Sequence, residues 1–201
     1  NLPLFPELLE EHNAANKVKQ DAPILVILGN PPYNGVAGIA MHEERDLTMA
    51  YRTTKVAAKP TGQGLNDLYV RFFRMAERRI VEKTGIGVIC YISNYSWLEG
   101  MSHTGMREHY LDVFDKIVID CLNGDKYKTG KVTPWGDPDP SVFSTRSNRV
   151  GIQVGTAIAL LVRRKGSTTE PKRCQAIEFR HLCGKNKLDR LKSDAQSGIK
   201  P

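Results

Sequence analysis

The sequence predicts an α/β fold in which parallel strands alternate with helices and an antiparallel pair of strands closes the sheet. Three observations support this: continuous aliphatic runs at 24–28 and 87–92, an amphipathic helix pattern between them, and two later apolar runs at 116–122 and 150–162. An apolar run without polar alternation fits a strand buried on both faces of a helix-covered sheet. The two later runs predict a hairpin-like terminal pair.

The first half of the chain reads as one strand–helix–strand unit. Residues 1–22 predict a polar, partly helical lead-in, and residues 24–28 the first strand. Residues 34–63 have no clear period and predict a loop or lid with a short helix. Asn66 and Asp67 offer an N-cap for the crossover helix, whose apolar side chains then recur every four residues. Such a unit is expected to be parallel and right-handed. The recurring residues are Leu68, Phe72, Ala76 and Ile80.

The second half predicts a short helix over 106–114, followed by the two strands of the terminal pair. Residues 123–148 form a long connection rich in Gly, Pro, Ser and Lys. Loops of this length inside a domain are usually functional or disordered. From Arg163 onward the chain reads as basic and irregular.

The charge balance favours a polyanionic partner. The chain has 29 Lys and Arg against 22 Asp and Glu, a net charge of +7. Residues 163–192 alone hold ten Lys or Arg against three acidic residues. Such a surplus favours nucleic acid, although a solvated tail explains it equally well.

Several classes of protein are excluded by the same composition. No apolar run approaches the roughly 18 residues of a membrane span, and no signal peptide pattern opens the chain. The four cysteines form no C-x-x-C pair, so we predict no disulfide and no metal site. We therefore expect a soluble, cytoplasmic protein without membrane contact. Because the chain opens on Asn1 rather than Met, we expect it to be processed or to be a piece of something longer.

The residues that point to chemistry are Asn30-Pro31-Pro32-Tyr33, directly after the first strand. Ligands of open α/β sheets gather beyond the carboxyl ends of strands. A following proline keeps Asn30 out of helical geometry, and neither proline has an N–H to donate. The result is a stiff pair of acceptors, the Asn30 side-chain oxygen and the Pro31 carbonyl, beside the π face of Tyr33. A strand-ending Pro-Pro without a function is the alternative.

Two acceptors and a stacking plane suit a planar ring with an exocyclic NH₂, of which adenine is the obvious case. Accepting both amino protons draws the nitrogen lone pair out of conjugation with the ring. The amine then becomes able to attack an activated methyl group. No carboxylate or histidine base is needed before the attack, since the proton leaves later.

With this motif the sequence resembles the amino-methyltransferases that act on N6 of adenine in DNA. Their hallmark is (Asp/Asn/Ser)-Pro-Pro-(Tyr/Phe/Trp). Longer blocks are similar to type ISP restriction–modification enzymes, and residues 179–191 (FRHLCGKNKLDRL) resemble the junction toward their target-recognition domain. The longer blocks are DLYVRFFRMAER (67–78), GVICYISNYSWLEGM (87–101), MREHYLDVFDKIVIDCLNGDKYKTGKV (106–132), DPDPSVFS (137–144) and GIQVGTAIALLVRR (151–164).

The resemblance implies the C-terminal, target-base half of a Rossmann-like class I methyltransferase fold. It implies a lead-in at 1–22, a partial catalytic domain at 23–165 and a basic segment at 166–201 that leads toward a recognition domain. The implied activity is site-specific transfer of a methyl group from S-adenosylmethionine to N6 of a flipped adenine in double-stranded DNA. The implied setting is a prokaryotic restriction–modification enzyme.

Carried over by motif, Asn30 and Pro31 accept from the adenine amino group, Pro32 stiffens the corner, and Tyr33 stacks on the flipped base. Phe143 is the candidate for a second aromatic on the base, or a pin for its loop. Asn30 and Asp67 are candidates for the cofactor edge, although N-capping also explains Asp67. A set of cations in the 123–149 region is expected to contact the DNA backbone, or to be a solvated loop. The cations are Lys126, Lys128, Lys131, Arg146 and Arg149.

One motif of these methyltransferases is missing. The Phe-x-Gly-x-Gly loop through which such enzymes bind S-adenosylmethionine is missing from the sequence. We therefore expect weak or absent cofactor binding by this chain alone. Strand 24–28 would then be an exposed apolar edge that dimerises, or that pairs with the remaining domains of a parent protein or with a partner supplying the missing strands.

Two other functions stay open. One is methylation of RNA or of a protein amide by the same tetrapeptide. The other is a non-catalytic module that binds DNA or a partner.

Overall fold

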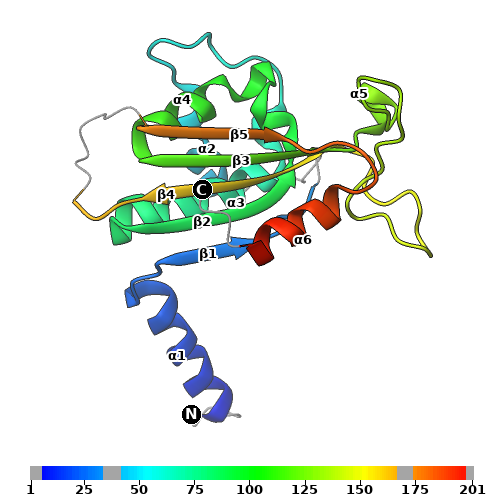
Figure 1. Cartoon of the computed structure of the whole chain (residues 1–201). Helices are drawn as coiled ribbons and strands as arrows, with labels where there is room; N and C mark the ends of the chain where they lie inside the picture. Colours follow the sequence, from blue (N-terminus) through cyan, green and yellow to red (C-terminus); the bar gives the residue numbers. More distant parts are fainter. Residues whose placement is uncertain (1–5, 34–41, 167–173, 198–201) are drawn as a thin grey trace.

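The computed structural model describes residues 6–33, 42–166 and 174–197 (Figure 1). They form a mixed five-stranded sheet of order β1-β2-β4-β3-β5. The strands are β1 (Val26–Gly29), β2 (Gly87–Asn94), β3 (Lys116–Asn123), β4 (Thr156–Arg163) and β5 (Ala176–His181). β1 pairs with β2 and β3 with β5 in parallel, whereas β4 runs antiparallel to both β2 and β3. The predicted α/β class, the parallel first pair and the antiparallel terminal pair are confirmed.

Six α-helices are found in the described ranges, joined in places by short 3₁₀ turns. α3 continues directly into a π-helical turn, η3 (Arg78–Thr84), that leads to β2. The 3₁₀ turns are η1 (Ala50–Arg52), η2 (Gly64–Asn66), η4 (Tyr95–Leu98) and η5 (Met101–His103). The helices are α1 (Pro6–Asp21), α2 (His42–Met49), α3 (Leu68–Glu77), α4 (Thr104–Val113), α5 (Lys126–Thr129) and α6 (Lys187–Ser197). No helix of these ranges is long and apolar enough to cross a bilayer.

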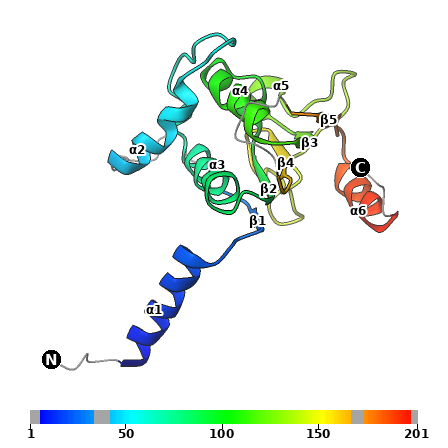
Figure 2. The same ribbon diagram turned by 90° about the vertical axis from the view of Figure 1, so that its left-hand side faces the viewer.

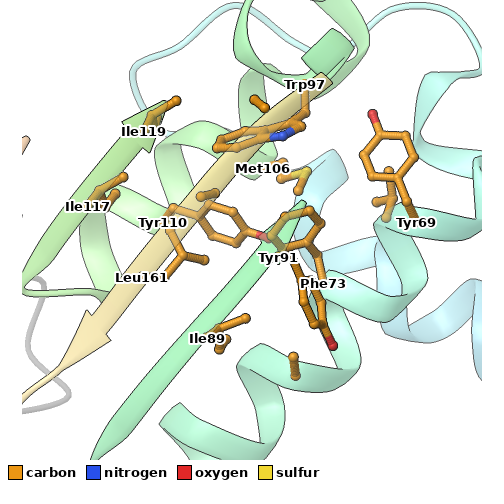
Figure 3. Packing of buried hydrophobic residues seen from close by; sticks show 14 of the residues in the cluster. Tyr69, Phe73, Ile89, Tyr91, Trp97, Met106, Tyr110, Ile117, Ile119 and Leu161 are labelled. Carbon is orange, nitrogen blue, oxygen red and sulfur yellow. The ribbon is translucent and has the colours of Figure 1, made fainter. Parts of the chain in front are cut away.

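The hydrophobic core lies between one face of the sheet and helices α3 and α4 (Figure 3). Its centre is aromatic. The Phe73 ring lies 5.0 Å from that of Tyr91 and 5.7 Å from that of Trp97, and Tyr110 lies 6.0 Å from Trp97. Tilted and edge-on ring pairs at these distances stabilise a core beyond the area that they bury. This layer fixes β2 and β4, and with them the end of the sheet that carries the predicted site.

The opposite face of the sheet is much less covered. Helices α2, α3 and α4 lie on one side of the sheet and α6 on the other (Figures 1 and 2). Along β2, residues at odd positions are buried, whereas Val88, Cys90 and Ile92 on the other face are only half-buried. A sheet face with apolar side chains and few covering helices lacks part of its packing.

The first strand differs from its sequence-based prediction. We expected residues 24–28 to be buried on both faces, but β1 lies at the edge of the sheet with Val26 57% and Leu28 71% exposed. The prediction of burial is therefore wrong in this chain, because β1 has a neighbouring strand on one side only. The expected exposed apolar edge is what the structure has.

The C-terminal part also differs from expectation. Residues 150–155 precede β4 rather than form part of it, and the described residues after Arg163 include a strand, β5, and a helix, α6. β5 extends the sheet beyond the boundary that we predicted at residue 165. Arg180 of β5 bonds the Asp120 carboxylate of β3 through two nitrogens, at 2.7 and 2.8 Å, and also pairs with Asp194 of α6. β5 is joined to β3 by a parallel ladder, and this long-range ion pair adds a side-chain link from β5 and α6 to the sheet.

Candidate functional site

The Asn30–Tyr33 segment lies at the carboxyl end of β1, next to β2. The parallel register sets Gly29 level with Tyr91, two residues after which comes Ser93 near the end of β2. A Cβ on Gly29 would lie 3.0 Å from the Tyr91 ring, so the small residue lets β1 pass close to that side chain. The segment therefore leaves the sheet at the edge where ligands of α/β proteins gather.

Tyr33 and Asn30 contact each other at this edge. The Tyr33 hydroxyl donates to Asn30 Oδ1 at 2.7 Å and also lies 3.2 Å from the Ile92 carbonyl oxygen of β2. Pro31 is buried, Tyr33 is half-buried, and Asn30 and Pro32 are exposed. Burial raises the pKa of Tyr33 to about 12, so its hydroxyl keeps its proton and remains a donor at neutral pH.

Among the residues that the structure describes, one acceptor of this corner is in use and the other has no donor. Within the described residues no donor bonds the Pro31 carbonyl oxygen, while Asn30 Oδ1 accepts from Tyr33. A carbonyl oxygen has two lone pairs, and the Tyr33 hydroxyl occupies one of those on Asn30 Oδ1. The arrangement can bind an amino group, and full access to Asn30 requires the Tyr33 hydroxyl to give way.

The end of β2 is tied to the long β3–β4 connection. Asn94 caps η4 by accepting from Ser96 N at 2.9 Å, and the Tyr95 N–H donates to the Gly155 carbonyl at 3.0 Å. A Cβ on Gly155 would lie 2.4 Å from the Tyr95 ring, so only glycine allows this ring to pack there. Two of the blocks that the sequence singled out, around residues 94 and 155, meet at this contact.

Asp125 organises the start of that connection. Its Oδ1 accepts from the backbone N–H groups of Tyr127 and Lys128 at 2.7 Å each, and its Oδ2 accepts from Gly155 N at 2.8 Å. Burial acts to raise the pKa of Asp125, but these backbone hydrogen bonds outweigh it and hold the pKa below its usual value. The carboxylate is the N-cap of α5 and fixes α5 against the start of β4.

The five predicted backbone-contacting cations fall into two groups. The Lys128 ammonium lies 2.5 Å from Glu99 Oε1 and 4.7 Å from the centre of the Tyr95 ring, and Lys131 donates to the Val150 carbonyl. These two lysines are engaged in contacts within the protein. Lys126, Arg146 and Arg149 are exposed.

The structure gives less support to the roles predicted for Asp67 and Phe143. Asp67 holds the N-cap position of α3, but its side chain makes no capping hydrogen bond, so the capping explanation of this side chain is wrong. Phe143 is half-buried in the turn that Ser144 N closes by donating to the Ser141 carbonyl at 3.0 Å. Its ring stacks on no other aromatic ring of the described residues. The structure brings Asn30 and Tyr33 together, and their role remains a prediction.

Two features were missed by the sequence reasoning. One is the buried pair of Asp139 and Lys187, whose atoms Oδ1 and Nζ lie 2.7 Å apart. The other is Trp135, which is 70% exposed. The available signal for Trp135 was a tryptophan between prolines and glycines in a loop. The Asp139–Lys187 pair joins residues 48 positions apart and has no local signal.

Comparison with known proteins identifies relatives of the chain. Residues 5–122, more than half of the chain, match the Eco57I restriction-modification methylase family. A search of curated proteins gives no match.

Three solved structures share the fold over almost the whole chain. The ATP-dependent Type ISP restriction-modification enzyme LlaBIII bound to DNA matches 95% of it, with a TM-score of 0.66 and 24% identity. A nuclease-deletion mutant of the Type ISP enzyme LlaGI with a DNA substrate mimic matches 92%, with a TM-score of 0.68 and 21% identity. A DrdV–DNA complex matches 98%, with a TM-score of 0.66 and 25% identity. The chain spans 13%, 17% and 18% of these chains, in that order. The resemblance to type ISP enzymes is confirmed.

Proposed function

Since the chain belongs to the Eco57I restriction-modification methylase family, we propose that it is the target-base half of a Rossmann-like class I methyltransferase domain. The intact enzyme transfers a methyl group to N6 of a flipped adenine in double-stranded DNA. The family match and the DNA-bound structural neighbours support the methyltransferase and DNA parts of this proposal.

The observation that carries the adenine assignment is the hydrogen bond from the Tyr33 hydroxyl to Asn30 Oδ1. This bond joins a hydrogen-bond acceptor to an aromatic side chain at the end of β1, which supports their acting together on one base. In the proposed complex the adenine amino group donates one proton to Asn30 Oδ1, in place of the Tyr33 hydroxyl, and the other to the Pro31 carbonyl. The Tyr33 ring covers the base and offsets part of the cost of unstacking it, by about 1–3 kcal/mol.

The two hydrogen bonds also prepare the nucleophile. With both amino protons held by acceptors, the lone pair on N6 points away from the ring plane and toward the methyl group. The proline pair keeps both acceptors in place, because it has no N–H groups that would draw the corner into a helix. After attack, the amine is cationic and its proton is acidic, so it leaves without a strong base.

The methyl donor that we propose is S-adenosylmethionine, which supplies an electrophilic methyl group when bound. The residues of this chain do not make a complete site for it. Asn30 and Asp67 are the side chains that we assign to its edge, and the sequence has no Phe-x-Gly-x-Gly loop. We propose that the missing strands of the sheet, with this loop, come from other domains of the parent protein or from a partner, and pair with the open edge of β1.

The test is Asn30→Ala in the intact enzyme, with radiolabelled methyl transfer to duplex DNA as the measurement. Losing one of two acceptors at the nucleophile is expected to lower kcat by about 10²–10³-fold, by analogy with loss of one oxyanion-hole donor. Asn13→Ala, on the exposed face of α1, is the matched control and is expected to leave kcat unchanged. Full activity of Asn30→Ala would overturn the proposal.

A second function is favoured by one observation, the missing cofactor loop. In this reading the chain binds DNA or a partner without turnover. Methyl transfer by the chain combined with the upstream strands would exclude it, and equal transfer to RNA or to a glutamine peptide would exclude the DNA assignment.

A further inference from the structure

We propose that a groove beside Trp135 is a contact site for a DNA strand, in which the indole stacks on a base and Lys185 and Arg190 bind phosphates. The inference rests on the proposed function, since that function makes DNA the substrate. It concerns residues outside the Asn30–Tyr33 corner.

Trp135 lies exposed in a hydrogen-bonded turn. Gly136 N donates to the Thr133 carbonyl at 3.0 Å, Thr133 N to the Asp137 carbonyl at 2.8 Å, and Val132 forms a bridge with Pro138. The other tryptophan of the chain, Trp97, is 3% exposed in the core. An indole that is 70% exposed on a hydrogen-bonded turn is held ready for a contact at little further entropic cost.

The base of the turn is anchored by a buried ion pair. Asp139 Oδ1 accepts from Lys187 Nζ at 2.7 Å and from Gly184 N at 2.8 Å, and Asp139 Oδ2 accepts from Gly124 N at 3.0 Å. Both charged side chains are 2% exposed. These bonds lock the Trp135 turn to the β5–α6 connection. The groove between them is therefore built by two segments far apart in the sequence.

The groove has a volume of about 430 Å³ and a mixed lining. The turn contributes Trp135 and Asp137 to the lining, and the chain after β5 contributes Lys185, Asn186 and Arg190. Lys185 and Arg190 are exposed, and neither forms an ion pair with another described residue. Since Asp137 repels anions from the turn, we place the phosphates at Lys185 and Arg190.

This set of groups fits a nucleic-acid strand better than a small anion. Aromatic stacking tolerates any base, and cations beside it hold the backbone without reading sequence. The loops after β1, β3 and β5 leave the sheet on the same side, so the groove and the Asn30–Tyr33 corner share one edge of the molecule (Figure 1).

The experiment uses tryptophan fluorescence of the 201-residue protein with a 20-base-pair duplex that carries a single-stranded overhang, whose unpaired bases are free to stack on the indole. Because Trp97 is buried, we expect base stacking to quench Trp135, and the quenching to disappear in Trp135→Phe. Trp135→Phe keeps a stacking ring and is expected to bind DNA nearly as tightly as the wild type. Trp135→Ala is expected to bind roughly 5- to 150-fold more weakly.

The phosphate part has its own measurement. Lys185→Gln combined with Arg190→Gln is expected to reduce the slope of log affinity against log salt by about 1.8, since each lost phosphate contact accounts for about 0.9. Lys17→Gln, on exposed α1 away from the groove, is the matched control and is expected to change the slope less.

Three results would overturn the inference. One is DNA binding with unchanged tryptophan emission. Another is equal DNA affinity of Trp135→Ala and Trp135→Phe. The third is quenching by AMP or RNA at concentrations where DNA has no effect. Failure of the proposed function is distinguishable, since loss of the adenine role of Asn30 leaves quenching of Trp135 by duplex DNA intact.

Discussion

At the scale of single residues, Tyr33 combines two opposing effects. Its ring is the surface that we assign to the base, whereas its hydroxyl occupies Asn30 Oδ1, the oxygen that we assign to the base's amino group. A half-buried phenol with a pKa of about 12 does not ionise to release that bond at physiological pH. The Tyr33 hydroxyl therefore competes with the substrate amino group for Asn30 Oδ1.

This competition predicts the behaviour of Tyr33→Phe. The variant keeps the ring and removes the donor, so kcat/KM for methyl transfer is expected to equal or exceed that of the wild type. A hydrogen bond worth about 0.5–1.5 kcal/mol sets the gain at roughly 2- to 12-fold or less. Tyr33→Ala, which loses stacking, is expected to fall roughly 5- to 150-fold. Steady-state kinetics on duplex DNA measure kcat/KM for both variants. Equal losses in the two would contradict the stacking role.

At the scale of elements, the sequence predicted those features that rest on local periodicity. The β1–α3–β2 unit has the expected order, and the helix pattern at 68–80 marks α3 and η3. Ala76 and Ile80 are buried as predicted, but in the first turns Tyr69 and Phe73 are buried in place of Leu68 and Phe72. The Asn30–Tyr33 corner was equally visible, since its chemistry lies in four adjacent residues.

The features that were missed depend on distant partners. β5 has Ile177 and Phe179 exposed and is joined to β3 partly through Arg180 and Asp120, so no buried apolar run marks it. Burial of 24–28 was predicted from an unbroken apolar run, but burial also needs a second neighbouring strand, which the described residues do not supply. Local sequence does not contain either partner.

The link between α6 and the sheet carries a prediction of its own. Lys187→Ala leaves the Asp139 carboxylate buried without its cation, and such a loss costs about 3–5 kcal/mol of unfolding free energy. Urea denaturation at neutral pH measures it. Lys192→Ala, an exposed lysine on the same helix, is the control and is expected to change the free energy by less than about 0.5 kcal/mol. Equal stability of the two variants would show that the pair does not hold α6.

At the scale of the whole molecule, the sheet is unfinished along one edge. β1 pairs only with β2 and presents Val26 and Leu28 to solvent, and helix α1 before it has no buried residue. An open apolar edge is a template for another chain. The same edge is where we propose that the cofactor half joins. In the isolated protein we therefore expect the β1 edge to pair with the β1 edge of a second copy.

Leu28→Lys tests this expectation. A charge on the outer strand opposes edge-to-edge pairing, so the variant is expected to sediment as a smaller species than the wild type at the same micromolar concentration. Val56→Lys is the matched control, because Val56 is 80% exposed in a different segment. Identical sedimentation of wild type and Leu28→Lys would show that β1 does not mediate association.

The position of β4 has a consequence for how the protein is made. It is the fourth strand to leave the ribosome but the central one of the sheet, between β2 and β3. Until residues 156–163 emerge, β2 and β3 lack the strand that lies between them, and their apolar side chains lack that neighbour. Nascent chains shorter than this are therefore the ones most exposed to chaperones and proteases.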